Sequence, residues 1–314
     1  MSVTEAPRPR FSVVIPTHNR QELLHRSIGS VRAQTFGNWE LIVVDDGSSD
    51  ETRRVVSEIG DSRIFYVWQE NSGVSAARNH GISLARGDYI GFLDDDDEYL
   101  PEHLAVLDRE LSARGNPVCL AYTLAYRSEG GERTPIETPV GSRESPIVLG
   151  ANPGTPSIAI HRNILRHHRF DVAIKCHDDA ELWGRIALAA PVVRVESRTV
   201  VLHAHPGERL SGGLDVAGLL EMRRTYDYID STRSRRVAIP RSAMRRKRRS
   251  IELGLAYRYA KQAHRLTSLR TLIRIVRADP RVIRDDRLWR IVRLLGPIGH
   301  RSQPDAVQQS IELR

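Results

Sequence analysis

The stretch Tyr89-Ile-Gly-Phe-Leu-Asp-Asp-Asp-Asp-Glu98 joins an apolar run directly to five consecutive acids. The apolar half predicts a buried strand, so the acids mark the point where that strand ends. Five adjacent carboxylates repel one another and cannot all be buried without a partner. Either solvent or a hard divalent cation must absorb this charge, and carboxylate oxygens suit Mg²⁺ and Mn²⁺. The stretch therefore predicts a solvated turn or a metal site.

The residues before this stretch alternate between predicted strands and helices. Apolar, β-branched runs predict strands at 11–15, 39–44, 64–68 and 89–93. Helical spacing of apolar residues predicts helices at 20–34, with Asn19 as the candidate cap, and at 74–85, and a further helix opens after Asp50. Such alternation predicts a parallel, doubly wound sheet, which binds its ligands beyond the carboxyl ends of the strands.

Three polar clusters follow these predicted strands: Thr17-His-Asn19, Asp45-Asp46 and the acids 94–97. Each cluster alone could cap a helix, but all three at strand ends indicate a binding site. The sequence has no G-x-G-x-x-G after the first strand and no G-x-x-x-x-G-K-[ST]. These absences disfavour a dinucleotide-dependent oxidoreductase and a P-loop NTPase.

Five ordered segments resemble the successive motifs of the family 2 inverting glycosyltransferases. The resemblance implies an α/β fold of the GT-A type, with a Rossmann-like, mostly parallel sheet flanked by helices. It also implies a nucleotide-diphosphate sugar as donor and Mn²⁺ or Mg²⁺ as cofactor. The segments are Val13-Val-Ile-Pro-Thr-His-Asn-Arg20, Gln34-Thr-Phe36, Glu40-Leu-Ile-Val-Val-Asp-Asp-Gly-Ser-Ser-Asp-Glu-Thr52, Gly73-Val-Ser-Ala-Ala-Arg-Asn79 and Gly87-Asp-Tyr-Ile-Gly-Phe-Leu-Asp-Asp-Asp-Asp97.

The resemblance assigns nucleotide-binding roles to the first four segments. Thr17 and Asp46 would meet the nucleobase, and His18 stands where a base-stacking aromatic residue is usual. Asn19 belongs to the same cluster, and Arg78 would lie near the nucleotide. A carboxylate and a hydroxyl can bond to the edge of a base without fixing which base is bound. Uridine diphosphate is the nucleotide that we expect.

The acidic stretch would hold the ribose and the metal. By the resemblance, Asp95 would contact the ribose, Asp96 would bind the metal that bridges the two phosphates, and Asp94 begins the Asp-x-Asp pattern. The chemistry is consistent with these roles, because a cation neutralises the negative charge that grows on a departing diphosphate.

A second acidic pair, Asp178-Asp179, opens a predicted helix whose apolar positions continue to residue 190. The pair could simply complement the helix dipole. The resemblance instead places the general base at Asp179, which would remove the proton of an acceptor hydroxyl as it attacks the anomeric carbon. Family members often have Glu-Asp here, so Asp178 departs from the pattern and is a phosphate or acceptor candidate.

Residues between and after these motifs complete the predicted catalytic domain, 1–215. We expect a helix at 101–113, strands at 118–126, 157–160, 192–195 and 199–203, and an irregular segment at 127–156. That segment is either an acceptor-side loop or a tolerated insertion. The segment after residue 203 resembles the end of the family's domain, with His205 as a metal or phosphate ligand and with Arg209 and Ser211 as phosphate or acceptor candidates.

Charge separates this domain from the tail, 216–314. Residues 1–215 carry a net charge of −7 and residues 216–314 carry +15, which together give the +8 of the chain. Amphipathic stripes predict a basic helical appendage. It could pack on the main domain or contact an anionic membrane at its cytoplasmic face. Nucleic acid is a weak alternative, because the tail lacks interleaved aromatic residues.

The composition indicates where in the cell the protein is expected to act. The chain has two cysteines, Cys119 and Cys176, no stretch of 18 uninterrupted apolar residues and no apolar signal core near its start. We therefore expect a cytoplasmic protein, peripheral at the inner membrane face if the tail binds lipid. The predicted function is metal-dependent, inverting transfer of a sugar from a nucleotide-diphosphate donor to a hydroxyl of a glycan, lipid-linked glycan or small glycoside. A non-catalytic protein that binds nucleotides or polyanions on the same fold is the alternative.

Overall fold

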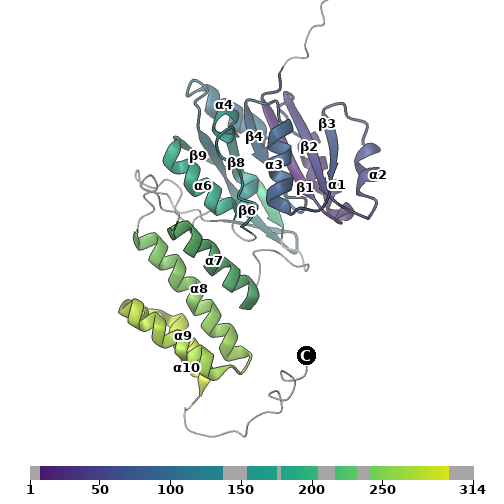
Figure 1. Ribbon diagram of the computed structural model, residues 1–314. Helices are drawn as coiled ribbons and strands as arrows, with labels where there is room; N and C mark the ends of the chain where they lie inside the picture. The colour runs from purple at the N-terminus through teal and green to yellow at the C-terminus, as the bar shows by residue number, and fades with distance from the viewer. Residues whose placement is uncertain (1–7, 137–153, 175–177, 204–215, 232–240, 297–314) are drawn as a thin grey trace, which may run out of the picture. The chain divides into compact units, whose positions relative to one another are not determined.

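The fold is described here from a computed structural model, for residues 8–136, 154–174, 178–203, 216–231 and 241–296. Four parallel strands form the first half of the sheet, in the order β3-β2-β1-β4 (Figure 1). They are β1 (Phe11–Thr17), β2 (Trp39–Asp46), β3 (Ile64–Gln69) and β4 (Tyr89–Phe92). The helices α1 (Gln21–Arg32), α2 (Thr52–Ser57) and α3 (Val74–Leu84) connect them. This confirms the predicted βα alternation.

The second half of the sheet is mixed. Strand β8 (Ile158–His161) lies antiparallel between β4 and β6 (Leu120–Glu129), and β9 (Val192–His203) is parallel to β6. Two short strands complete it, β5 (Glu98–Tyr99) beside β9 and β7 (Glu132–Pro135) beside β6. The helices of this half are α4 (His103–Ser112), α5 (Arg162–Leu165) and α6 (Asp178–Ala189), with a 3₁₀ turn, η1 (Thr155–Ser157).

Two sequence predictions differ from this arrangement. The strands expected at 192–195 and 199–203 are one strand, because β9 keeps pairing with β6 across a register shift near Leu124. The segment expected to be irregular, 127–156, begins with the β6–β7 hairpin, while residues 137–153 lie outside the described ranges.

Alternating side chains of the central strands build two apolar layers. Val13 and Ile15 face a layer that includes α1 and α4, and Val14 faces a layer that includes α3 and α6. Strand β1 is buried along its whole length, as its apolar, β-branched sequence predicts. Cys119 is packed in the first layer as a small apolar residue, as expected, and Cys176 lies outside the described residues.

The chain divides into two compact units, one of residues 1–213 with 221–247 and one of residues 214–220 with 248–314. The helices that follow β9 are α7 (Val216–Ser231), α8 (Arg241–Lys261), α9 (Arg265–Ala278) and α10 (Asp286–Leu295), with the 3₁₀ turn η2 (Pro280–Arg284). The boundary at 215/216 and the role of an appendage stay predictions. None of the helices in the described ranges is both long and apolar enough to cross a membrane.

A glycine sets the distance between α3 and the sheet. A Cβ atom added at Gly81 would lie 2.3 Å from Cγ1 of Val14, whose side chain is fully buried in β1. The helix can approach the strand only because this position carries no side chain. The position of α3 matters for the site, because this helix carries Arg78.

We expect Gly81→Ala to lower the free energy of unfolding by about 1–3 kcal/mol, since the added methyl group overpacks the α3–β1 contact. Gly29→Ala is the matched control, because its Cβ would meet no heavy atom within 4 Å beyond its own helix. In that exposed helical position alanine should raise stability by about 0.5–1 kcal/mol. Urea unfolding of both variants measures the difference, and equal stability would refute the packing constraint.

Candidate active site

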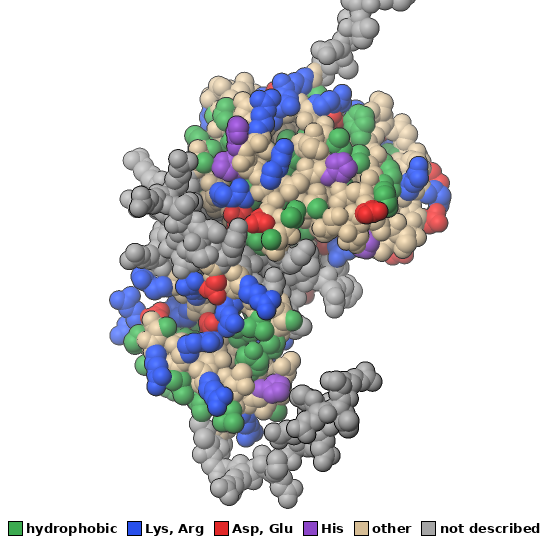
Figure 2. All heavy atoms as spheres, in the orientation of Figure 1, with side chains coloured by type: hydrophobic (Ala, Val, Ile, Leu, Met, Phe, Trp, Pro, Cys, Tyr) green, Lys and Arg blue, Asp and Glu red, His purple; other side chains and the backbone are tan. Residues whose placement is uncertain are grey.

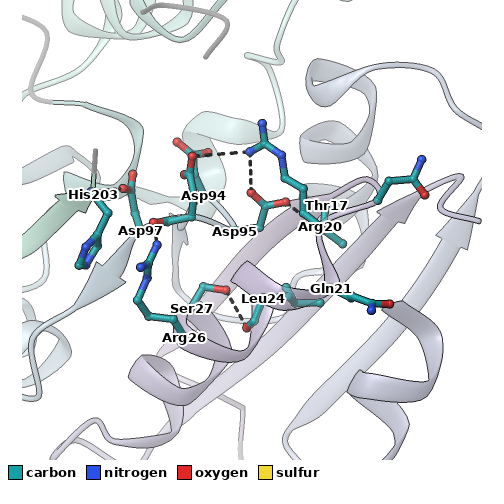
Figure 3. Close-up of polar contacts among 12 residues, drawn as sticks. Thr17, Arg20, Gln21, Leu24, Arg26, Ser27, Asp94, Asp95, Asp97 and His203 are labelled. Atoms are coloured by element: carbon teal, nitrogen blue, oxygen red, sulfur yellow. Dashed lines mark hydrogen bonds and ion pairs between the residues drawn. The ribbon is translucent and has the colours of Figure 1, made fainter. Parts of the chain in front are cut away.

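The predicted polar clusters do meet at one edge of the sheet. Strands β1 and β4 are parallel neighbours, so Thr17 and the acids after β4 leave the sheet on the same side. The Thr17 hydroxyl donates a hydrogen bond to Oδ2 of Asp95 over 2.8 Å. Figure 3 shows Asp94, Asp95 and Asp97 in this turn, with Arg20 reaching toward Asp95 from the start of α1. Two side chains, those of Thr17 and Arg20, thus hold Asp95 in this turn.

Asp95 is a buried carboxylate with two partners. Besides Thr17, it accepts a hydrogen bond from Arg20, whose Nη1 lies 3.1 Å from Oδ1. Burial raises the pKa of Asp95 to about 6, although Arg20 and the Thr17 hydroxyl act in the opposite direction. The same Arg20 nitrogen lies 3.5 Å from Oδ2 of Asp96. One guanidinium thus connects the predicted ribose contact with the predicted metal ligand.

Asp94, Asp96 and Asp97 each bring one carboxylate oxygen into a group whose atoms lie within 4.8 Å of one another. Three hard oxygen donors at this spacing fit Mg²⁺ or Mn²⁺, so the residues present match the expected cofactor. Burial raises the pKa of Asp94, with Arg78 opposing and Asp96 adding to the shift. Asp97, which the sequence left without a role, also accepts a hydrogen bond from the His203 backbone over 2.9 Å.

Arg78 is the buried link between the two acidic clusters. Its Nη2 lies 2.8 Å from Oδ1 of Asp94, and its Nη1 lies 3.1 Å from Oδ2 of Asp178. Burial lowers the pKa of the guanidinium, but attraction to Asp94 and Asp178 outweighs it and the pKa lies above its ordinary value. The expectation that Arg78 lies near the nucleotide stays a prediction, and what the geometry adds is this bridge.

Asp178 and Asp179 begin α6, as predicted, and point to different partners. Oδ2 of Asp178 accepts hydrogen bonds from Arg78 and, over 2.6 Å, from the hydroxyl of Ser75. Oδ2 of Asp179 accepts a hydrogen bond of 3.2 Å from the hydroxyl of Thr155 in η1. Asp178 is therefore held in place by α3, whereas Asp179 contacts η1 and the Ala180 backbone N–H, which donates to its Oδ1 over 2.7 Å.

Asp46 holds the loop between β3 and α3. Its Oδ1 accepts hydrogen bonds from the Ser72 backbone, at 2.9 Å, and from the Gln69 side chain, at 2.7 Å. Its Oδ2 accepts a third from the Gly73 backbone at 2.8 Å. The residue predicted at the nucleobase thus orders the loop that starts α3.

His18 and Asn19 lie in the exposed turn after β1. Asn19 has a positive φ of 52°, accepts a hydrogen bond from the Ser49 backbone over 2.8 Å, and so ties this turn to the one after β2. It was expected to cap the following helix, but Arg20 occupies the cap position and α1 begins at Gln21. The ring of His18 lies 3.2 Å from the side-chain nitrogen of Asn71.

The remaining predicted residues, His205, Arg209 and Ser211, lie outside the described residues. The contacts of Arg20, Ser75 and Thr155 were not predicted from the sequence. Signals existed for two of them, because Arg20 follows the first strand-end cluster and Ser75 lies three residues before Arg78 on the same helix face. Thr155 carried no signal, since its contact with Asp179 depends on tertiary structure.

Known proteins share both the sequence pattern and the fold. The pattern of glycosyl transferase family 2 matches residues 12–171. WcaA of Escherichia coli (strain K12), a glycosyl transferase assigned to colanic acid biosynthesis, is 32% identical over 218 residues, which cover 64% of this chain and 74% of WcaA. The Escherichia coli enzyme WfgD, a UDP-Glc:α-D-GlcNAc-diphosphoundecaprenol β-1,3-glucosyltransferase, is 44% identical over 94 residues, covering 30% of this chain and 37% of that enzyme. The chain thus matches only about a third of WfgD.

Solved structures show the same GT-A fold. S. aureus TarS (residues 1–349) with UDP-GlcNAc has a TM-score of 0.59 at 18% identity, covering 80% of this chain and 72% of that one. The mannosyltransferase PcManGT of Pyrobaculum calidifontis, with GDP-Man and Mn²⁺, has a TM-score of 0.59 at 16% identity and covers 91% and 86%. At these sequence identities the structural similarity supports the fold alone.

We expect Arg78→Met to lower the free energy of unfolding by about 3–5 kcal/mol, because it leaves the buried Asp178 and the partly buried Asp94 without their shared cation. Adding Asp178→Asn should recover part of the loss. Arg54→Met is the control, since Arg54 makes ion pairs with Glu51 and Glu58 on an exposed helix. If urea unfolding gave the Arg78 and Arg54 variants the same stability, the buried bridge would not hold the site together.

Proposed function

The chain belongs to glycosyl transferase family 2, and we propose that it transfers a sugar, with inversion, from a nucleotide-diphosphate donor to a hydroxyl acceptor. Membership makes it a glycosyltransferase, in place of the non-catalytic binding protein that the sequence left open. The observation that carries the proposal is the bridge of Arg78 between Asp94 and Asp178. It joins Asp94, a proposed metal ligand, to Asp178, the residue directly before the proposed base Asp179.

The donor half of the proposed reaction uses the turn after β4. Asp96 and Asp94 would hold Mn²⁺ or Mg²⁺, and Asp97 offers a third oxygen in the same group. When bound, such a cation neutralises the charge that develops on the diphosphate as the sugar–oxygen bond breaks. Asp95 would contact the ribose, an interaction supported by its fixed position against Thr17 and Arg20.

The nucleobase would lie at the ends of β1 and β2. Thr17 and Asp46 are the proposed contacts, with His18 and Asn19 along the exposed edge of the same region. UDP is the proposed nucleotide, because TarS was solved with UDP-GlcNAc and WfgD is named for UDP-Glc. GDP is the competing choice, because PcManGT was solved with GDP-Man.

The acceptor half uses the start of α6. The Asp179 carboxylate would remove the proton of the acceptor hydroxyl while that oxygen attacks the anomeric carbon from the face opposite the diphosphate, which inverts the anomeric configuration. Asp178 would act as a positioning residue, since Ser75 and Arg78 fix it one residue before the base. Three further residues, His205, Arg209 and Ser211, are proposed to contact metal, phosphate or acceptor.

A polysaccharide or lipid-linked glycan is the proposed acceptor class. WcaA is assigned to colanic acid biosynthesis, and WfgD is named for a diphosphoundecaprenol acceptor. A small glycoside that offers the same hydroxyl would serve as a substitute substrate in vitro. Together these points favour a role in polysaccharide biosynthesis.

Two substitutions should separate the halves of the reaction. We expect Asp179→Asn to lower kcat by about 10²–10⁴-fold, the usual contribution of a general base, and to leave donor affinity within a few-fold. Asp96→Asn should abolish the manganese-dependent part of nucleotide-sugar binding. Binding and turnover are measured with a panel of UDP and GDP sugars, by calorimetry and by donor hydrolysis or transfer.

Asp286→Asn is the matched control for this pair, because Asp286 is exposed in α10 of the other compact unit. This substitution should change neither the manganese-dependent binding of the nucleotide sugar nor the turnover. Full transfer by the Asp179 variant would remove the assigned base, and unchanged manganese-dependent binding by the Asp96 variant would remove the assigned metal ligand.

A further inference from the structure

Helices α9 and α10 fill the core of the second compact unit with only part of their apolar residues. On α10, Leu288, Ile291 and Leu295 are buried, and they pack in one cluster with residues of α8, α9 and η2. Leu269 and Val276 of α9 are partly buried against the same cluster, and other large apolar residues of α9, η2 and α10 lie outside it.

These remaining residues are concentrated on the surface. Among the described residues, eleven large hydrophobic side chains are exposed, and six of them lie between residues 266 and 294. Trp289 is 48% exposed and Ile283 is 49% exposed, and the indole nitrogen of Trp289 donates a hydrogen bond of 2.8 Å to the Ile283 carbonyl. The other four are Leu266, Ile273, Val292 and Leu294. Such concentration indicates an interaction surface.

The net charge around this surface is positive, although Arg274 is paired with Glu252 of α8. Residues 265–295 contain nine arginines, all exposed, and three aspartates. Two of the aspartates are already paired, Asp279 with Arg249 at 3.0 Å and Asp285 with Arg287 at 2.8 Å. On the face seen in Figure 2, basic side chains lie beside hydrophobic ones over the C-terminal helices. The partner of this surface should therefore be both anionic and apolar.

We propose that α9, η2 and α10 bind the surface of a membrane rich in anionic phospholipids, with Trp289 and Ile283 entering the headgroup boundary. Amphipathic helices that combine arginine with exposed Trp, Ile and Leu lie in this interface, where the guanidinium groups reach the phosphates and the apolar side chains meet the acyl chains. This inference goes beyond the proposed reaction and does not depend on it.

Other occupants fit the surface less well. A second copy of the chain would bring two arginine-rich faces together, and like charges across an interface oppose association. A nucleic acid would neutralise the positive charge of the arginines. Single-stranded nucleic acids, however, stack their bases on several aromatic side chains, and residues 265–295 contain a single aromatic residue, Trp289. Neither occupant explains apolar side chains and arginines on the same helices as simply as a lipid surface.

Trp289 offers a direct probe. The chain has four tryptophans; Trp39 and Trp183 are buried, and Trp68 is exposed in the other unit. In the full-length Trp68→Phe variant, vesicles of phosphatidylglycerol mixed with phosphatidylcholine should shift the emission to shorter wavelength, and brominated acyl chains should quench it. Pure phosphatidylcholine vesicles should do neither. If the emission of Trp289 does not change with the anionic vesicles, the proposal is overturned. This holds even if the protein binds to these vesicles, because binding by charge alone would leave Trp289 in water.

Charge reversal tests the arginines by vesicle sedimentation. Arg290→Glu with Arg293→Glu should weaken partitioning onto anionic vesicles by at least about tenfold, since each arginine near such a surface contributes about 1 kcal/mol. Arg53→Glu with Arg109→Glu, on exposed positions of α2 and α4, is the matched control and should leave it unchanged. The proposal is overturned if the α10 variant partitions onto the vesicles as strongly as the wild type does. It is also overturned if the protein binds no vesicles and instead forms a dimer that Trp289→Ser dissociates.

Discussion

A single buried guanidinium fixes the relative positions of the two acidic clusters on which the site depends. Arg78 contacts Asp94 after β4 and Asp178 at the start of α6, which are far apart in sequence and meet only in the folded chain. Asp178 is buried and Asp94 is partly buried, and taking carboxylates out of water costs free energy unless a cation compensates. Helices α3 and α6 and the end of β4 must therefore close around Arg78 together. The same contact that stabilises the fold therefore also aligns the site.

The rest of the N-terminal unit supports that contact. Gly81 lets α3 approach Val14 closely, and Asp46 orders the loop from which α3 starts. Ser75, one turn before Arg78, adds a second bond to Asp178. An arginine with two nitrogens can serve two carboxylates at once, whereas a lysine offers one compact charge.

Much of this could be predicted from the sequence, because short-range patterns determine it. Apolar, β-branched runs gave the first four strands, and the polar residues that follow them gave the sheet edge where Thr17 and Asp95 meet. Long-range pairing could not be predicted in this way. Tertiary packing determines the antiparallel insertion of β8, the continuity of β9 and the contact of Thr155 with Asp179. The spacing of apolar residues along the sequence does not predict such packing.

Arg78 is expected to govern both the donor half and the acceptor half of the site, because it contacts a carboxylate in each. Arg78→Lys tests this expectation most directly, because lysine keeps the charge but reaches one carboxylate at a time. Calorimetry of UDP with Mn²⁺ reports on the donor half, and turnover at saturating donor reports on the base. Both the affinity for UDP with Mn²⁺ and the turnover should fall in this variant while it stays folded. Loss of one with the other unchanged would contradict this expectation.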